Sequence, residues 1–235
     1  MRPSLSLAVP AADWVGLVHP ELTPPSNLHH LRDTTAGTFF YLYLIVDIWS
    51  RKIVGWEVYE RETAEFAAQV LERAVWAAKC LTSPPTLHAD NGSPMKGPTM
   101  KTTMERLGVT ASFSRPRVSN DNPFSEALFR TCKYVPDWPT RGFGTIDEAR
   151  LWVQGFVRWY NTGHRHSAIR FVTPDQRHRG DDQSLLANRH QVYQRARAAH
   201  PERWSGNTRC WKPIGSVWLN PERPDAMTGP AEQAA

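Results

Sequence analysis

Cysteine and long apolar runs are both scarce in this chain. The three cysteines, Cys80, Cys132 and Cys210, are widely spaced and include no Cys-x-x-Cys pair. This spacing argues against a disulfide framework and against a structural zinc site, and it favours a reducing cytoplasm. The longest uninterrupted apolar run, Phe39–Val46, has eight residues. Because a membrane-spanning helix needs about 20 apolar residues, we expect a cytoplasmic protein without such a span.

Acidic residues are outnumbered by basic ones. The 235 residues include 28 Lys and Arg against 23 Asp and Glu, which gives a formal net charge of +5 and a pI near 9.3. This balance favours a polyanion such as nucleic acid as a partner. The length allows one domain with a full core and some appended structure, or two small domains.

Regular patterning begins only after the first 36 residues, so we expect residues 1–36 to form an irregular lead-in. The aromatic and β-branched run 39–46 and the alternating run 52–59 predict an antiparallel hairpin. Thr63 is a candidate cap for the helix that follows. Further along, the patterns predict a strand over 86–89, a helix through 100–107, a strand over 109–113 and a helix that begins at Pro123. This order predicts an α/β fold, a mixed sheet flanked by helices.

The last third of the chain reads as helical and then proline-rich. Thr145 and Glu148 have the spacing of a capping box, and we expect Trp152 and Trp159 of the following helix to lie in the core. A polar helix through 195–197 precedes a tail in which only 215–220 hints at a strand. We therefore divide the chain into a lead-in (1–36), a core (37–180) and a C-terminal helix with a proline-rich tail (181–235).

Two carboxylates stand where a catalytic metal site could form. Asp90 follows the short strand 86–89, and Glu126 lies at the start of the next helix but one, with 35 residues between the two acids. Lys133 lies two turns after Glu126 on the same helical face. Mg²⁺ takes oxygen ligands, and metal-assisted phosphodiester chemistry needs such carboxylates. The alternative is an exposed strand-end Asp90 and a surface Glu126 that pairs with Arg130 at i+4.

Several segments resemble, in order, the integrase-like catalytic core of bacterial insertion-sequence transposases. They are Leu87–Gly92, Ser114–Pro116, Asn120–Glu126, Phe129–Tyr134 and Trp159–Asn161 with His164–His166, supported by the hairpin segments Tyr41–Asp47 and Ser50–Trp56. The resemblance covers about residues 37–180. It implies a ribonuclease-H-like fold, an Asp, Asp, Glu triad, and Mg²⁺ or Mn²⁺ as cofactor. It also implies DNA cleavage and strand transfer at transposon ends by a homo-oligomer.

Carried over by position, Asp90 matches the second acid of that triad, Glu126 the third, and Lys133 the basic residue that holds the transposon end. In the family the first acid lies in a Trp-x-x-Asp-Ile-Thr-like pattern, about twenty residues before the aspartate that matches Asp47. That count leads to Asn27. The expected acid is therefore replaced, as a reading frame disrupted upstream would leave it.

Asp33 and Asp47 are the nearest substitutes for the first acid. We expect Asp33 to be a solvated turn residue, and Asp47 to be structural or to support the site from behind. Arg115, Arg117, Arg130 and Lys133 cluster around the site in sequence and could track a DNA backbone. A solvated basic face is the alternative to that interpretation. Two hypotheses follow: a metal-dependent transposase core, or a DNA-binding or transposase-interacting remnant that cannot transfer strands.

Overall fold

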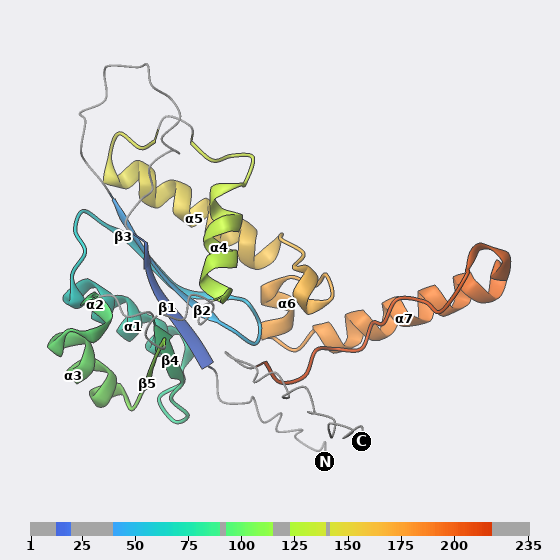
Figure 1. The fold of residues 1–235 in the computed structure, drawn as a ribbon, viewed down its shortest axis with the longest axis horizontal. Coiled ribbons are helices and arrows are strands. Elements are labelled where there is room, and N and C mark those ends of the chain that lie inside the picture. The colour runs from blue at the N-terminus through green and yellow to red at the C-terminus, as the bar shows by residue number, and fades with distance from the viewer. Residues whose placement is uncertain (1–12, 20–39, 90–92, 115–122, 140–141, 218–235) are drawn as a thin grey trace, which may run out of the picture.

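The computed structural model describes residues 13–19, 40–89, 93–114, 123–139 and 142–217 (Figure 1). Its centre is a five-stranded sheet of order β3-β2-β1-β4-β5. The strands are β1 (Asp13–His19), β2 (Tyr41–Asp47), β3 (Ile53–Tyr59), β4 (Thr86–Ala89) and β5 (Thr110–Phe113). β1 pairs with β2 antiparallel and with β4 parallel, so the first strand in the chain lies in the middle of the sheet. Within the described residues, no helix is long and apolar enough to cross a membrane.

Helices α1, α2 and α3 cover one face of the sheet. α1 (Ala64–Ala78) begins at Thr63, whose hydroxyl accepts a hydrogen bond from the Phe66 N–H at 3.2 Å. α2 (Ser93–Lys96) and α3 (Pro98–Leu107) follow β4. The approach of α1 to β3 depends on Gly55, because a Cβ there would lie 2.9 Å from the Cβ of Ala74. Any larger residue would push α1 away from the sheet.

Helices α4 (Pro123–Lys133) and α5 (Ile146–Thr162) cover the opposite face. Their buried side chains form one apolar cluster with alternate residues of β2 and β3, which are Leu42, Leu44, Val46, Ile53 and Val58. α4 also contacts β1. The sheet thus has two packed faces, and α4 is the helix that lies over its middle strand (Figure 1).

The C-terminal part extends away from this body. A short 3-10 helix η2 (Ser167–Ile169) and helix α6 (Pro174–His178) lead into α7 (Asp182–Ala199), and a second 3-10 helix, η3 (Pro201–Arg203), turns the chain back. The returning segment runs beside α7, and its Thr208 Oγ1 accepts a hydrogen bond from Gln194 at 3.0 Å (Figure 1). We call residues 183–217, which comprise α7 after its first residue and this returning segment, the arm.

Most of the expected elements are confirmed. The hairpin, the capped helix α1, β4, α3, β5 and α4 all form where the sequence patterns predict them. The Thr145 hydroxyl accepts from the Glu148 N–H at 3.2 Å, although the Glu148 carboxylate accepts from the Gly144 N–H and not from Thr145. The capping box is therefore only half formed.

Three expectations fail. The lead-in is not irregular throughout, since β1 lies within it and is held by strands on both sides. Residues 215–217, the described part of the expected late strand, have no strand structure. Trp159 was expected in the core, but 42% of its surface is exposed because it lies on the outer side of α5.

Candidate active site

The carboxyl end of β4 is firmly fixed. Leu87 and Ala89 are buried against α1 and α3, while His88 is buried on the opposite side of the strand. His88 Nδ1 lies 3.0 Å from the Ser112 hydroxyl and Nε2 lies 3.3 Å from the Ser114 hydroxyl. The Ser114 N–H also donates to the Ala89 carbonyl at 3.0 Å. Asp90 follows Ala89 in sequence but is outside the described residues.

Glu126 lies in the first turn of α4, on its exposed face. Ser125, Leu128 and Cys132 are the buried side of the helix. Glu126, Arg130 and Lys133 are spaced i, i+4 and i+7, so they share the outer face, and all three are exposed. No ion pair joins Glu126 to Arg130 in the described part of the chain, so the alternative of a simple surface pair is not supported. Arg115 and Arg117 lie outside the described residues.

The middle strand β1 runs beside β4, including the end of β4 that leads to Asp90. Gly16 pairs with Ala89 of β4, and the next residue, Leu17, pairs with Leu44 of β2. Leu17 is also the third residue after Trp14, where the pattern Trp-x-x-Asp-Ile-Thr has its acid. The expected position, Asn27, is not part of this strand and lies outside the described residues, as does Asp33. Asn27 therefore stays a prediction, and Trp14 with Leu17 offers a second match to the spacing of that pattern, within β1.

Asp13 lies at the opposite end of the β1–β4 pairing from Ala89. It is the one carboxylate in β1, and it pairs with Thr86 at the opposite end of β4 from Ala89. Three residues of strand, about 10 Å, therefore separate the level of Asp13 from the level of Ala89. The carboxyl end of β4 has no acidic neighbour on the described part of the middle strand.

Asp47 has a structural role. It is 2% exposed, and its two oxygens accept hydrogen bonds from the N–H groups of Trp49 at 3.1 Å and Ser50 at 3.2 Å. The Ser50 hydroxyl donates to Oδ2 as well, and His178 Nδ1 lies 3.3 Å from the same oxygen. Because its acceptor sites are taken by the turn between β2 and β3, Asp47 has little capacity left for a metal ion.

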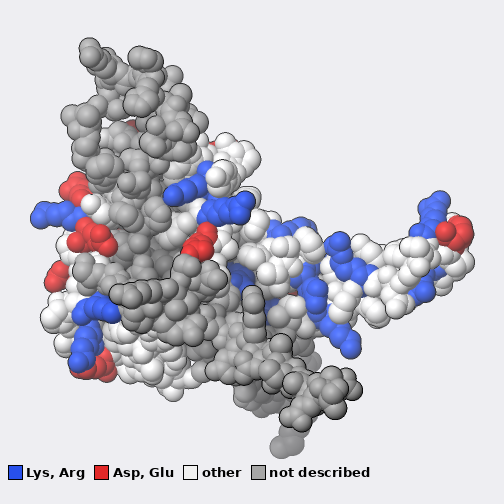
Figure 2. Space-filling model, viewed as in Figure 1, with Lys and Arg blue, Asp and Glu red and all other residues white. Residues whose placement is uncertain are grey.

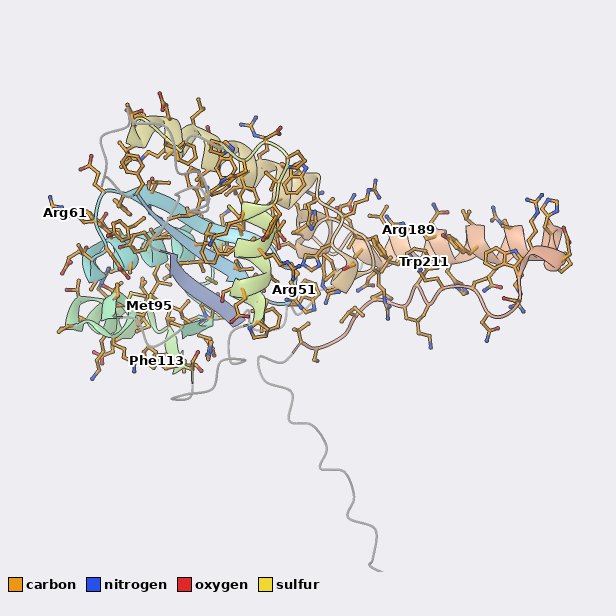
Figure 3. The ribbon with its side chains drawn as sticks, turned by 45° about the horizontal axis from the view of Figure 1, so that its top comes forward. Arg51, Arg61, Met95, Phe113, Arg189 and Trp211 are labelled. Atoms are coloured by element: carbon orange, nitrogen blue, oxygen red, sulfur yellow. The ribbon has the colours of Figure 1, made fainter. Side chains whose placement is uncertain are left out.

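The same turn reaches α4 through Arg51. This residue has φ 68°, and its guanidinium lies 4.1 Å from the centre of the Phe124 ring in the first turn of α4 (Figure 3). Ile48, which is buried, packs against Phe124 and Phe129 of the same helix. Burial lowers the pKa of Arg51 to about 10. The turn that Asp47 stabilises thus supports the amino end of the helix that carries Glu126.

The described residues do not by themselves make a metal site. Among them no group of three or more His, Cys, Asp or Glu side chains could hold an ion. Glu126 is described and Asp90 is not, while Asp47 is occupied and Leu17 brings no oxygen. The expected carboxylates include Asp90, so the described residues contain only part of the set that would hold a divalent ion.

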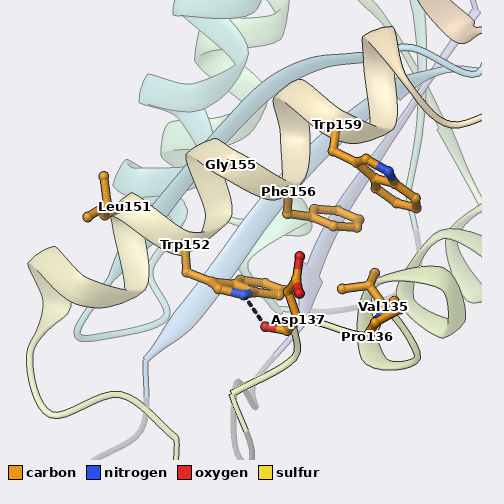
Figure 4. Close-up of a pocket in the computed structure, with 8 residues that line it drawn as sticks. All are labelled: Val135, Pro136, Asp137, Leu151, Trp152, Gly155, Phe156 and Trp159. Atoms are coloured by element: carbon orange, nitrogen blue, oxygen red, sulfur yellow. Dashed lines mark hydrogen bonds between the residues drawn. The ribbon is translucent and has the colours of Figure 1, made fainter.

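A concavity lies on the outer side of α5, with a volume of about 460 Å³. It is lined by Val135, Pro136, Asp137, Leu151, Trp152, Gly155, Phe156 and Trp159 (Figure 4). The Trp152 indole N–H donates to the Asp137 carbonyl at 2.8 Å, which fixes one wall. The lining is apolar apart from Asp137, so this groove has none of the residues needed for phosphodiester chemistry.

Comparison with known proteins identifies the fold and the family. Profiles described as integrase core domain match residues 28–119 and 107–174, together more than half of the chain. Residues 28–174 thus match the integrase core domain family. The chain contains an integrase core of the kind found in insertion-sequence transposases, with a ribonuclease-H-like fold.

Two curated relatives are transposases of insertion sequences. The transposase InsF of IS3A from Escherichia coli strain K12 is 27% identical over 139 residues, which are 59% of this chain and 48% of that protein. The transposase of IS904 from Lactococcus lactis is 29% identical over 148 residues, 60% of this chain and 55% of that protein. This chain therefore spans about half the length of the curated relatives it matches.

Two solved structures share the fold at low sequence identity. A simian T-cell lymphotropic virus intasome, solved in complex with PP2A regulatory subunit B56 gamma, contains a chain with TM-score 0.50 and 17% identity, covering 71% of this chain and 54% of that one. A chain of the Mos1 mariner paired end complex with Mn has TM-score 0.50 and 13% identity, covering 63% and 48%. At these identities the likeness shows the fold alone.

Proposed function

We propose that this chain is the catalytic core of an insertion-sequence transposase, which cleaves DNA at transposon ends and transfers the strands to target DNA. The observation that supports this most is the position of α4 against the middle strand β1, beside the carboxyl end of β4. That arrangement directs the Glu126 helix toward the strand that Asp90 follows. The curated relatives are transposases of similar core sequence.

In this proposal Glu126 and Asp90 supply the carboxylates of the site, and the exposed α4 face holds DNA. Arg130 and Lys133 lie on the same face as Glu126, so they can contact phosphates beside it. Arg115 and Arg117 would extend that phosphate path. Asp47 and Arg51 take no part in the chemistry and position α4. Relatives of this kind would act as a homo-oligomer on paired DNA ends, with Mg²⁺ or Mn²⁺ neutralising phosphate charge when bound.

A second candidate function has its own support. Leu17, three residues after Trp14 in β1, stands where a Trp-x-x-Asp pattern would have its acid, and a leucine side chain offers no oxygen to a metal ion. A core that binds DNA without joining it would have this composition. The two candidates differ in one measurable property, the transfer of a transposon-end 3′-hydroxyl to target DNA.

A joining assay with labelled transposon ends in Mg²⁺ and in Mn²⁺ decides between them. Joining by the wild-type protein that Glu126→Gln abolishes supports the transposase core. Joining that appears only with Leu17→Asp shows a core that lacks its first acid. Val18→Asp is the matched control, because neighbouring strand residues lie on opposite faces. DNA binding without joining in every variant overturns the catalytic proposal and supports the second candidate.

A further inference from the structure

The positive charge of this protein is concentrated in the arm, residues 183–217. This segment contains six basic residues, Arg189, Arg195, Arg197, Arg203, Arg209 and Lys212, and one acidic residue, Glu202. Its formal charge of +5 equals that of the whole chain, so the other 200 residues are neutral overall. In Figure 2 the Lys and Arg side chains follow the arm along its length, and the acidic side chain lies near its tip.

The arm is anchored only at its root. Ile169, Val172, Leu186 and Trp211 form a buried cluster there, and the Arg177 guanidinium donates to the Ile214 carbonyl at 2.9 Å. Arg189 and Trp211 also lie in this inner part (Figure 3). Beyond the root, α7 has few large apolar side chains, and Leu186 is its one buried apolar residue. A projecting helix with so little apolar surface contributes little to a core, so its side chains face solvent or a ligand.

Three of the basic residues on the arm are exposed and uncommitted. The side chains of Arg195, Arg203 and Lys212 make no hydrogen bond or ion pair with any described residue. Glu202, the one acid, has His200 as its neighbour at 3.4 Å. At the root, Arg165 adds positive charge beside Arg189 and contributes, after burial, to the lowered pKa of Arg189. The arm therefore has surplus positive charge that nothing in the described chain neutralises.

From this distribution we infer that the arm is a second DNA-binding surface, separate from the Glu126 face, which holds the phosphate backbone of duplex DNA without reading its sequence. A helix of 18 residues is about 27 Å long, which corresponds to about eight base pairs of duplex. This inference rests on the proposed function and adds to it a further stretch of bound DNA. It does not depend on catalysis, because it contains none of the site carboxylates.

A second copy of the chain suits the arm less well than DNA. The cores of protein interfaces are depleted in charged residues and rich in large apolar ones. Val192 is the one large apolar side chain that the described part of the arm exposes, at 51%. Tyr193 and Trp211 are turned inward, with their ring centres 5.2 Å apart. The surface that remains is basic and polar, which suits phosphate.

Charge neutralisation on the arm tests the inference. The variant Arg195→Gln/Arg203→Gln/Lys212→Gln removes three uncommitted charges, and Arg61→Gln/Lys79→Gln/Lys101→Gln removes three exposed charges from the body. Affinity for an unrelated duplex of about 30 base pairs is measured by fluorescence anisotropy between about 0.05 and 0.2 M salt. We expect the arm variant to bind at least about tenfold more weakly at 0.1 M salt, with a salt slope smaller by about two to three. The body variant should match the wild type.

Other outcomes overturn the inference. Equal losses in the two variants would show an effect of net charge alone, and an unchanged affinity of the arm variant would show that the arm does not hold DNA. A changed sedimentation coefficient with unchanged DNA affinity would make the arm a protein contact. Glu126→Gln separates this test from the proposed function, since it should lose joining and keep binding. Hydroxyl-radical footprints should shrink by about eight base pairs in the arm variant only.

Discussion

The carboxylates of Asp47 and Glu126 have opposite surroundings. Asp47 is buried, and two backbone N–H groups, a hydroxyl and a histidine surround its oxygens. Glu126 is exposed, and no ion pair with a described residue occupies it. The difference indicates that a buried carboxylate stabilises the fold when donors of its own turn fill its acceptor sites. An acid is available for a ligand when its helix presents it outward.

The largest expected effect is on the chemistry of the exposed acid. If the proposed function holds, Glu126→Gln should lower the rate of strand joining about a thousandfold, or about 4 kcal/mol, because a neutral amide cannot replace a metal-binding carboxylate. The free energy of unfolding should change by less than about 0.5 kcal/mol, since the residue is a surface one. Joining rates and urea unfolding of the same preparation check both parts. A large loss of stability would remove the distinction between the two acids.

The buried acid should behave in the opposite way. Asp47→Ala leaves the N–H groups of Trp49 and Ser50 without their acceptors, so we expect it to lower the free energy of unfolding by about 3 kcal/mol. Asp47→Asn keeps one acceptor oxygen and should cost about half as much. Urea unfolding measures the loss. An Asp47→Ala protein of normal stability but without joining activity would instead place Asp47 in the chemistry.

Asn161 tests how the turn is held from the other side. Its side chain accepts from the Ile53 N–H at 2.9 Å and donates to the Ile53 carbonyl at 3.0 Å. Asn161→Ala leaves two buried backbone groups unpaired, and we expect a loss of about 2 kcal/mol in urea unfolding. Asn188→Ala, on the exposed surface of α7, is the control and should stay within about 0.5 kcal/mol. Equal effects of the two substitutions would contradict this role.

The smallest expected effect is on how the stability of the fold depends on pH. Burial, together with Arg51 and His164, lowers the pKa of His166 to about 4, and its Nδ1 accepts from the Ala168 N–H at 3.2 Å. The folded state therefore binds this proton less readily than the unfolded state, whose histidine has its ordinary pKa near about 6.5. Stability is complete above that value and falls as the pH drops toward 4. Urea midpoints of His166→Asn should fall less over this range than those of the wild type, and parallel curves would refute the assignment.

The sequence predicted local elements well and the middle of the sheet poorly. The hairpin, the Thr63 cap and the Pro123 start of α4 depend on neighbours in sequence, and all are found in the structure. β1 depends on partners that lie far away along the chain, and its seven residues lie between Pro10 and Pro20, so no local signal marked it. The one exception is Trp14, since Leu17 follows it at the spacing of the Trp-x-x-Asp pattern.

The candidate site was predicted in part. The shared face of Glu126, Arg130 and Lys133 follows from helical spacing alone, and the structure confirms that all three are exposed on it. Their roles, and those of Asp90, Arg115 and Arg117, stay predictions. The contact of His178 with Asp47 and that of Arg51 with Phe124 could not be predicted, since they join segments more than seventy residues apart in sequence. The net charge predicted a polyanion partner, but it did not predict that the positive charge lies on the arm.

The bond between Asn161 and Ile53 also bears on solubility. β3 is an edge strand, and an open edge is a template on which a strand of another molecule can add. At Ile53 both backbone groups are already taken by a side chain from α5. The Asn161 side chain thus makes the hydrogen bonds that a neighbouring strand would make. The first residue of that edge is therefore not available to a strand of a second molecule. Loss of Asn161 would expose a nucleus for sheet-to-sheet aggregation as well as weaken the fold.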